Sequence, residues 1–261
     1  MTLKISKIQI KNLCKSFDNK VVLDGISLDV YTGESLVIIG ASGTGKSVLI
    51  KTILGLIQQD SGSIVIDGDE VAELSSGARQ KYMRKFGMLF QGGALFDSLP
   101  VWENIAFMAL QGMGAQGRSL NKKEAMTLAA EKLKAVNLER ETLYRYPSEL
   151  SGGMQKRVAL ARAIASNPEI IFFDEPTTGL DPITSSTINH LIRENVQKRG
   201  ITSVTITHDM SSVRAIADRV ALLHNGKIMW QGDVGELDEA DNAYLHQFVH
   251  GLREGPIKSV Y

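Results

Sequence analysis

Residues 35–47 read Ser-Leu-Val-Ile-Ile-Gly-Ala-Ser-Gly-Thr-Gly-Lys-Ser, and this stretch decides the fold of the chain. Ser35–Ile39 is a compact run with the length of a buried β-strand. The eight residues that follow have the spacing G-x-x-x-x-G-K-S, and Val48–Leu54 predicts a helix directly after them. A strand, a glycine-rich loop and a helix in this order are typical of a phosphate-binding loop, or P-loop.

Each part of this loop has a role in binding phosphate. Glycines let the backbone curl, so that successive N–H groups and the N-terminus of the helix converge on one anion. We expect Lys46 to reach the outer phosphates and the Ser47 hydroxyl to ligate Mg²⁺. A glycine turn without a ligand would need a chance match, for which residue frequencies give odds of about one in a hundred. The predicted nucleotide-contacting residues are Gly40, Ala41, Ser42, Gly43, Thr44, Gly45, Lys46 and Ser47.

The composition is that of a globular chain with no dominant charge. The 261 residues include 29 Lys+Arg and 29 Asp+Glu, and 43% of the residues are hydrophobic. This length suits one large domain or two small ones. A net charge of zero provides no basic excess, so we expect no nucleic-acid partner and no general attraction to an anionic membrane surface. Cys14 is the single cysteine, which precludes an intramolecular disulfide and is compatible with a reducing compartment.

The sequence offers no candidate for a membrane-spanning helix or a signal peptide. The N-terminal residues alternate polar with apolar side chains and include Lys4 and Lys7. The longest promising uncharged stretch, residues 104–117, falls short of the about 20 residues that span a bilayer. We therefore expect a soluble, cytoplasmic protein.

Two kinds of strand predict an α/β fold. Alternation at Ile8/Ile10 and at Ile26/Leu28/Val30 is typical of half-buried antiparallel strands near the N-terminus. Ile170–Phe173 and Ser203–Thr207 are compact runs which, like Ser35–Ile39, are separated from one another by helical stretches. That pattern predicts a parallel sheet. Further short strands are expected at residues 63–66 and 88–90, and a hairpin is expected at 220–230 with its turn at Asn225-Gly226.

Capping signals define three helices. Asn121 and Glu124 form a capping-box pattern before residues 125–136, and a helix from Gly152 must end before Pro168. Asp181-Pro182 and the closing Gly200 bound a third helix. The middle of the chain, residues 92–165, is therefore expected to be mainly helical.

The run Ile170–Phe173 ends at two carboxylates, Asp174 and Glu175. Asp174 at the strand end can hold Mg²⁺, directly or through water, and Glu175 can orient and deprotonate an attacking water. Taken alone, this pattern also fits a strand that ends at a solvated acidic turn. His208 and Gln91 each follow a predicted strand: His208 is a candidate for the γ-phosphate side of the site or a structural histidine, and the Gln91 amide could coordinate Mg²⁺ or water.

Leu150-Ser151-Gly152-Gly153 is the motif that resembles a known family, because it looks like the signature of ATP-binding cassette (ABC) ATPases. The other motifs follow in that family's order. Residues 40–47 resemble Walker A, Gln91 the Q-loop, Ile170–Glu175 Walker B, Gly179-Leu180-Asp181 the D-loop and His208 the switch histidine. The resemblance covers nearly the whole chain.

The sequence departs from the family pattern at two positions. Met154 replaces the usual Gln after the signature, where Ser151 and the glycine amides are the phosphate-contacting part. Phe17 stands where the family often has Tyr, and its ring keeps a face for stacking on adenine unless it is a core aromatic.

The resemblance implies a P-loop NTPase fold with an architecture of three parts: a RecA-like parallel sheet core, an N-terminal antiparallel β subdomain, and a helical ABC signature subdomain at about 92–165. It implies ATP and Mg²⁺ as cofactors, catalysis by Glu175, His208 and Gln91, and metal ligation by Ser47, Gln91 and Asp174. It also implies that two copies close head to tail, each presenting Ser151, Gly152, Gly153 and Asp181 to the ATP of the other. The cassette would span residues 1–250.

The segment 90–107 resembles the ATPase subunits of MCE-type lipid transporters, which include the system that maintains outer-membrane lipid asymmetry. The tail at residues 251–261 resembles theirs too and would either contact the partner ATPase subunit or fray. The resemblance implies four partners: a second copy, an integral membrane permease, an MCE substrate-binding protein and a small accessory subunit. It places the chain on the cytoplasmic face of the inner membrane. Leu95, Phe96 and Trp102 would lie at the wall of a permease-binding groove, whereas Ile105 and Phe107 fit the core.

Two alternative functions remain open at this point. An ATPase of an importer for a small solute such as an amino acid would share every catalytic motif. A soluble ABC ATPase acting on ribosomes or DNA would typically carry two cassettes or a long coiled-coil insertion, together with basic surfaces, and the sequence has neither feature.

Overall fold

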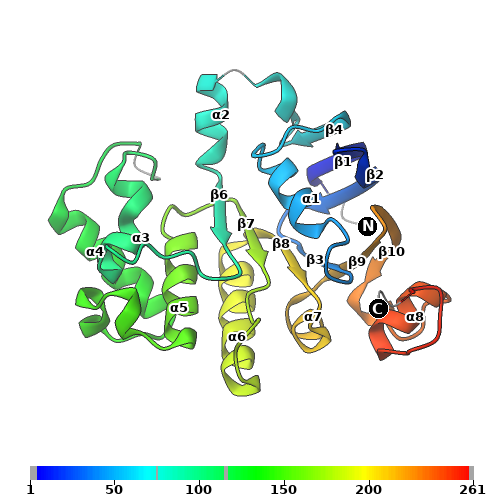
Figure 1. Cartoon of the computed structure of the whole chain (residues 1–261). Coiled ribbons are helices and arrows are strands. Elements are labelled where there is room, and N and C mark those ends of the chain that lie inside the picture. Colours follow the sequence, from blue (N-terminus) through cyan, green and yellow to red (C-terminus); the bar gives the residue numbers. More distant parts are fainter. Residues whose placement is uncertain (1–4, 75, 115–116, 259–261) are drawn as a thin grey trace. The chain divides into compact units, whose positions relative to one another are not determined.

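The computed structural model describes residues 5–74, 76–114 and 117–258, which form two compact units. The first unit combines residues up to 75 with residues from 204 onward, and the second is Ser76–Ser203. Figure 1 shows the elements of both units. None of the described helices is long and apolar enough to cross a membrane.

The first unit begins with an antiparallel sheet in the order β2-β1-β4-β5. β1 (Ser6–Phe17) pairs with β2 (Lys20–Tyr31), with Ile10 opposite Leu28. On its other side β1 pairs with β4 (Ser61–Ile66), which in turn pairs with β5 (Asp69–Glu70). Ile8, Ile10 and Leu28 are buried, which confirms the period-two alternation.

The same unit contains four strands in the order β10-β9-β3-β8. β3 (Ser35–Ile39) runs parallel to β9 (Arg219–His224), and β10 (Lys227–Asp233) returns antiparallel at the edge. All residues of β3 and of β8 (Thr202–Thr207) are buried, as expected for interior strands. The helices of this unit are α1 (Lys46–Ile53), α7 (Met210–Ile216) and α8 (Ala243–His250), with single 3₁₀ turns at Val71–Glu73 and Val234–Glu236.

The hairpin between β9 and β10 has the predicted tight turn. Asn225 and Gly226 both have positive φ, +47° and +74°, as a two-residue hairpin turn requires. The turn also touches β2, because the Gly226 carbonyl accepts a hydrogen bond of 2.9 Å from the Asp24 amide. A side chain at position 226 would come within 2.8 Å of the Val22 carbonyl oxygen, so a glycine is needed there.

The described residues of the second unit form two parallel strands and five helices. β6 (Phe86–Leu89) pairs with β7 (Ile170–Asp174), with Leu89 opposite Phe173. The helices are α2 (Ser76–Met83), α3 (Val101–Leu110), α4 (Lys122–Ala135), α5 (Gly152–Ala163) and α6 (Pro182–Arg199). Two 3₁₀ turns, Arg140–Tyr144 and Pro147–Glu149, join α4 to α5.

The predicted caps of α4 and α6 are confirmed. The Asn121 side chain accepts from the Glu124 amide while the Glu124 carboxylate accepts from the Asn121 amide, which is a complete capping box. Asp181 caps α6, and Gly200 closes it with a φ of +62°. Arg118 also contacts the Glu124 carboxylate and is the main reason that the pKa of this group is lowered to about 2.

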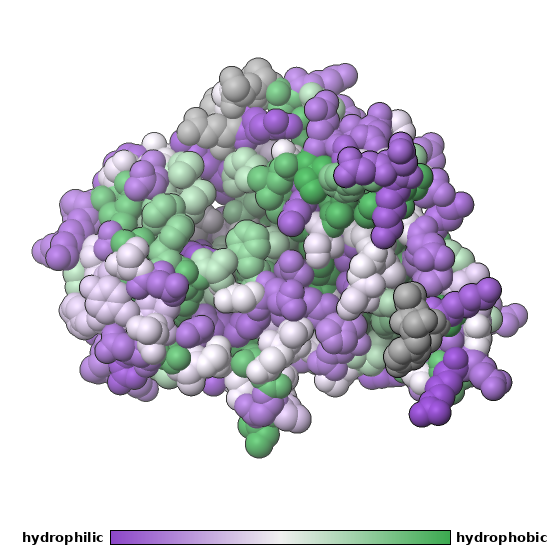
Figure 2. Space-filling view, in the orientation of Figure 1, coloured by the Kyte–Doolittle hydropathy of each residue, from purple (hydrophilic) through white to green (hydrophobic). Residues whose placement is uncertain are grey.

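A small apolar cluster joins α3 to α4. Ala106 and Ala109 pack against Leu120 and Ala125, and Trp102 covers the cluster from outside. The short alanine side chains let the two helices approach closely. Over α3 and α4 the space-filling view shows hydrophobic residues interspersed with hydrophilic ones (Figure 2).

Asn104 holds the loop that leads into α3. Its side chain is fully buried, and its Oδ1 accepts a hydrogen bond of 2.8 Å from the Phe96 amide. Its Nδ2 donates to the carbonyls of Phe96 at 3.0 Å and Leu99 at 2.9 Å. One amide therefore satisfies three polar backbone groups of the turn at residues 96–99.

We expect Asn104→Ala to lower the free energy of unfolding by about 1 to 3 kcal/mol, because the Phe96 amide and the Leu99 carbonyl of this partly buried turn lose their side-chain partner. Urea denaturation followed by circular dichroism measures the change. Ser98→Ala, at an exposed position of the same loop, is the control and should change the free energy of unfolding by less than about 0.5 kcal/mol. Equal stability of the two variants would contradict this role of Asn104.

Candidate functional site

The P-loop lies between β3 and α1 in the first unit, and its backbone requires glycine at two positions. Gly40 has a φ of +152°, and a Cβ there would lie 2.2 Å from the Leu223 carbonyl oxygen. Gly45 has a φ of +103°, and a Cβ there would lie 2.8 Å from the Val22 carbonyl oxygen. The loop is thus packed closely against β9 and β2, and no other residue type fits at either position without displacing the backbone.

Lys46 is buried at the start of α1, and its side chain curls back over the loop. Its Nζ donates to the carbonyls of Gly40 at 2.7 Å and Ala41 at 2.9 Å. The N-terminus of α1 has no side-chain cap, so the amide groups of its first turn can bind an anion. Ser47, the next residue, is exposed. Positive charge, backbone amides and a hydroxyl therefore meet at one place.

Phe17 ends β1 and is 43% exposed, which excludes the reading of a core aromatic. The Lys15 ammonium lies 5.2 Å from the centre of its ring. The Phe17 ring is therefore a surface group that can stack on a flat ligand.

His208 follows β8 in an exposed position, on a loop fixed by the next residue. Asp209 caps α7: its carboxylate accepts from the Ser211 amide at 3.0 Å and from the Ser212 hydroxyl at 2.6 Å. Burial raises the pKa of Asp209, but the hydrogen bonds from Ser212 and Ser211 outweigh it and leave this pKa below its usual value. A charged, well-bonded cap thus holds the backbone that presents His208.

In the second unit, Asp174 is the last residue of β7 and Glu175 turns away from the strand. Glu175 has a φ of +47°, which is unfavourable for a residue with a side chain. Its side chain is 91% buried, and its Oε2 accepts a hydrogen bond of 3.0 Å from the Thr178 hydroxyl. Strain of this kind is common at functional sites, and here it fixes the direction of the carboxylate.

Gln91 follows β6, with an exposed side chain and a backbone anchored to α5. Lys156 donates to the Gln91 carbonyl, and also to the Glu175 carbonyl at 3.4 Å. Arg162, one and a half turns further along α5, donates to the carbonyls of Gly93 and Ala94, both at 2.7 Å. Two cations of one helix therefore hold the loop that begins at Gln91.

Lys156 and Arg162 are both buried enough for their acidity to change. Burial lowers the pKa of the Lys156 ammonium, while the nearby negative charges of Asp174 and Glu175 act in the opposite direction. Burial also lowers the pKa of Arg162. Both groups donate to backbone carbonyls, which offset part of the cost of their burial.

The signature residues and the D-loop aspartate lie around one cavity of about 340 Å³. Ser151 caps α5 by accepting from the Met154 amide at 3.3 Å, and Asp181 caps α6 by accepting from the Ile183 and Thr184 amides, each at 3.0 Å. Hydrogen bonds from Thr184 are the main reason that the pKa of Asp181 is lowered. The cavity is lined by Ser151, Gly152, Gly153, Met154, Arg157, Gly179, Leu180, Asp181 and Thr184.

The described residues therefore place the predicted site residues in two groups. The first unit holds the P-loop, Phe17 and His208. The second holds Gln91, Asp174, Glu175, the signature and Asp181. Among the described residues, no three His, Cys, Asp or Glu side chains gather as a metal site. The predicted Mg²⁺ ligands Ser47, Gln91 and Asp174 instead supply a hydroxyl, an amide and a carboxylate, which are the oxygen donors that Mg²⁺ prefers.

A family model described as ABC transporter matches residues 23–178, more than half of the chain. The chain belongs to the ABC transporter family. The phospholipid transport ATP-binding protein MlaF of Haemophilus influenzae is 36% identical to this ABC chain over 97% of it and 94% of MlaF. The methionine import ATP-binding protein MetN of Carboxydothermus hydrogenoformans is 42% identical over 88% of the chain and 67% of MetN.

A solved ABC cassette has the same fold. It is a dimer in a post-hydrolysis state bound to ADP and Pi, and it superposes with a TM-score of 0.78 and 31% identity over 87% of this chain and 98% of that one. The α/β P-loop NTPase fold expected from the sequence is confirmed, and the enzymatic activity of this ABC chain is ATP hydrolysis.

Sequence reasoning missed the cations on α5. No role was predicted for Lys156, Arg157 or Arg162, yet Lys156 and Arg162 bind the loop after β6 and Arg157 lines the signature cavity. One signal was present in the sequence. Lys156 stands three, four and seven residues before Ala159, Leu160 and Ala163, so it shares the apolar face of the helix.

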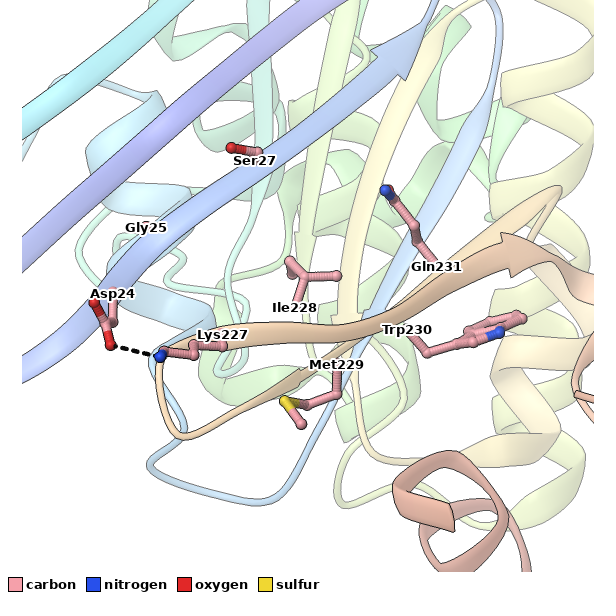
Figure 3. A pocket seen from close by; sticks show the side chains of 8 residues that line it. All are labelled: Asp24, Gly25, Ser27, Lys227, Ile228, Met229, Trp230 and Gln231. Atoms are coloured by element: carbon pink, nitrogen blue, oxygen red, sulfur yellow. Dashed lines mark ion pairs between the residues drawn. The ribbon is translucent and has the colours of Figure 1, made fainter. Parts of the chain in front are cut away.

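The first unit also contains a cavity of about 430 Å³ between β2 and the edge strand β10, with an ion pair of 3.2 Å between Lys227 and Asp24 at one end. In Figure 3, Ile228 and Gln231 point from β10 toward β2, whereas Met229 points away. None of the predicted site residues lines this cavity.

We expect Gly40→Ala to weaken ATP binding by at least about 100-fold, because the methyl group must displace the Leu223 carbonyl and with it the P-loop. Titration with a fluorescent ATP analogue measures the change. Gly235→Ala, at a glycine with open space around it, is the control and should leave the affinity unchanged. An affinity for Gly40→Ala within threefold of the wild type would refute the requirement for glycine.

Proposed function

We propose that this ABC ATPase powers the movement of phospholipid at a membrane, as the ATP-hydrolysing subunit of a transporter. The observation that carries the proposal is the end-to-end match to MlaF, which extends over 97% of this chain and 94% of MlaF. The match to MetN has the higher identity but stops at 88% of this chain and 67% of MetN. Similarity over whole length favours the phospholipid relative.

The P-loop would hold the phosphates of ATP. Its amides and the N-terminus of α1 bind the charge, Lys46 leaves its carbonyl partners for the outer phosphates, and Phe17 stacks on the adenine. Ser47, Gln91 and Asp174 would hold Mg²⁺, which neutralises charge on the phosphates when it is bound. The curled Lys46 side chain fits this role, because its ammonium already lies over the loop.

Glu175 would act as the general base of hydrolysis. Its carboxylate takes a proton from the water that attacks the γ-phosphate, and the Thr178 hydroxyl keeps the carboxylate in one orientation. Gln91 and His208 would contact the water and the γ-phosphate. A positioned base contributes about 10² to 10⁴ in rate.

A second copy of the chain would complete the site. The signature cavity has two helix N-termini, those of α5 and α6, and it lies in a different part of the chain from the P-loop. One chain cannot easily direct both anion sites at the same γ-phosphate from opposite sides. A head-to-tail dimer, as in the related cassette solved with ADP and Pi, supplies the signature of one copy to the P-loop of the other.

A membrane permease would bind near the start of α3. Phe96 is exposed and its ring lies 4.5 Å from that of Phe107, while Leu95 and Trp102 are half-buried. Ile105 is buried, as expected for a core residue, but Phe107 is only half-buried and joins this surface. The chain would then work on the cytoplasmic face of the inner membrane, with an MCE substrate-binding protein and a small accessory subunit as further partners.

The tail would contact the partner ATPase subunit. Its residues 251–258 are held back on α8 by one side chain, because the Gln247 amide donates to the carbonyls of Leu252 and Ile257 and accepts from the Ile257 amide at 2.7 Å. The last three residues, 259–261, lie outside the described part of the chain. A tail with a fixed start can present a defined surface to a neighbour.

The second candidate is an importer of a small solute such as methionine, which the 42% identity to MetN favours. Purification of the tagged chain with its membrane partners in mild detergent, followed by reconstitution in liposomes, separates the two functions. If the proposal holds, the complex carries phospholipid detectable by mass spectrometry, and its ATPase rate changes with the phospholipid composition of the liposomes. Stimulation by methionine, with no dependence on phospholipid, would favour the importer.

We expect Glu175→Gln to bind ATP, to accumulate as a closed dimer and to hydrolyse ATP at least about 100-fold more slowly than the wild type. The amide keeps the shape of the side chain but cannot accept a proton from water. Size-exclusion chromatography with ATP and Mg²⁺ and phosphate release measure the two effects. Glu169→Gln, at an exposed position just before β7, is the control. Turnover of Glu175→Gln near that of the wild type would exclude Glu175 as the base.

A further inference from the structure

Gln91 and Glu175 stand at equivalent places beyond two neighbouring strands. The pairing of β6 with β7 ends at Leu89 opposite Phe173, and each of the two site residues comes two positions later. No described ladder hydrogen bond joins the strands at this point. Here the Lys156 ammonium links the two strand ends instead, because it donates to the carbonyls of both Gln91 and Glu175.

The burial of this ammonium calls for an explanation. Lys156 is only 6% exposed, and its charge is opposed by desolvation. A methionine of similar length would fill the same space without that penalty. What the methionine could not do is bond two carbonyls at once.

The two carbonyls belong to backbone that needs support. Glu175 is held at a φ of +47°, which is unfavourable for a residue with a side chain and persists only when its surroundings impose it. Gln91 opens a loop in which Gly92 and Ala94 are exposed, and the φ of Ala94, +49°, is also unfavourable. Arg162 holds that loop further along, at Gly93 and Ala94, but does not contact Gln91 or Glu175.

We propose that Lys156 is a positioning residue for ATP hydrolysis, whose ammonium fixes the backbone of Gln91 and Glu175 relative to each other and to the signature helix α5. The proposal rests on the roles given above to Gln91 and Glu175. Lys156 contacts neither the nucleotide nor water in this role: it acts through the two residues that do. Ser151 caps the same helix five residues earlier. Helix α5 therefore connects the signature directly to the backbone of Gln91 and Glu175.

The test compares Lys156→Met with Lys132→Met in the purified transporter complex. Lys132 is a matched control, because it is a buried lysine of the same unit, with a pKa likewise lowered by burial, and its ammonium bonds the Asn167 side chain at 2.9 Å, a residue with no place in the site. The measurements are kcat, KM for ATP, the Kd of a fluorescent ATP analogue and the thermal denaturation midpoint of each variant.

We expect Lys156→Met to lower kcat by about 10- to 100-fold, because a shift of about 1 Å in a reacting group has an effect of this size. The Kd of the analogue should stay within threefold, since the P-loop is untouched. Lys132→Met should keep the wild-type kcat whatever it does to the denaturation midpoint. Lys156→Arg, which can still donate to both carbonyls, should recover at least half of the wild-type kcat.

A kcat of Lys156→Met within twofold of the wild type overturns the proposal, and so does a loss of nucleotide affinity as large as the loss of kcat. If Lys156→Met does not fold, Lys156→Gln takes its place: a shorter neutral amide should lower kcat at unchanged Kd, and a wild-type kcat overturns the proposal equally. Glu175→Gln is measured alongside. If it retains turnover, the assignment of the base fails; if it is inactive while Lys156→Met is fully active, only the positioning role fails.

Discussion

Hydrogen bonds from two cations of α5 to backbone carbonyls hold together the part of this molecule that contains Gln91 and Glu175. Lys156 binds the carbonyls of Gln91 and Glu175, and Arg162 binds those of Gly93 and Ala94. Charged donors make stronger hydrogen bonds than neutral ones, and the low dielectric of the interior strengthens them further. The same helix begins at Ser151, so the signature, the Q-loop and the Walker B carboxylates are parts of one bonded unit.

The P-loop in the first unit is held differently, because its backbone packs directly against the backbone of neighbouring strands. Gly40 and Gly45 are needed because the carbonyls of Leu223 and Val22 lie where their side chains would be. Lys46 donates to two carbonyls of the loop itself. The P-loop is thus shaped by the absence of side chains, whereas in the second unit charged side chains bond the backbone.

Local sequence signals predicted the elements that are bounded by glycine-rich loops, tight turns or helix caps. The P-loop, the turn at Asn225-Gly226 and the caps of α6 at Asp181 and Gly200 were all readable, because each depends on a few adjacent residues. The helices α2, α7 and α8 went unpredicted, since seven or eight residues give too little periodicity to be recognised. The family motifs gave the site residues, but not the positive φ of Glu175 or the burial of Lys156. Those depend on which segments pack together, and a lysine on a helix looks the same in sequence whether water or a carbonyl receives its hydrogen bonds.

α5 holds the loop after β6 through main-chain oxygen atoms, those of Gln91, Gly93 and Ala94. Every residue has such an atom, so the side chains at positions 95 and 96 can be exchanged without loosening the anchor on α5, whereas Gly93 has a φ of +74° that favours glycine. Selection can therefore alter the outer surface of this loop and the start of α3, while Gln91 and Glu175 keep their places. The part of the loop that α5 holds is thereby separate from the side chains that a partner would recognise.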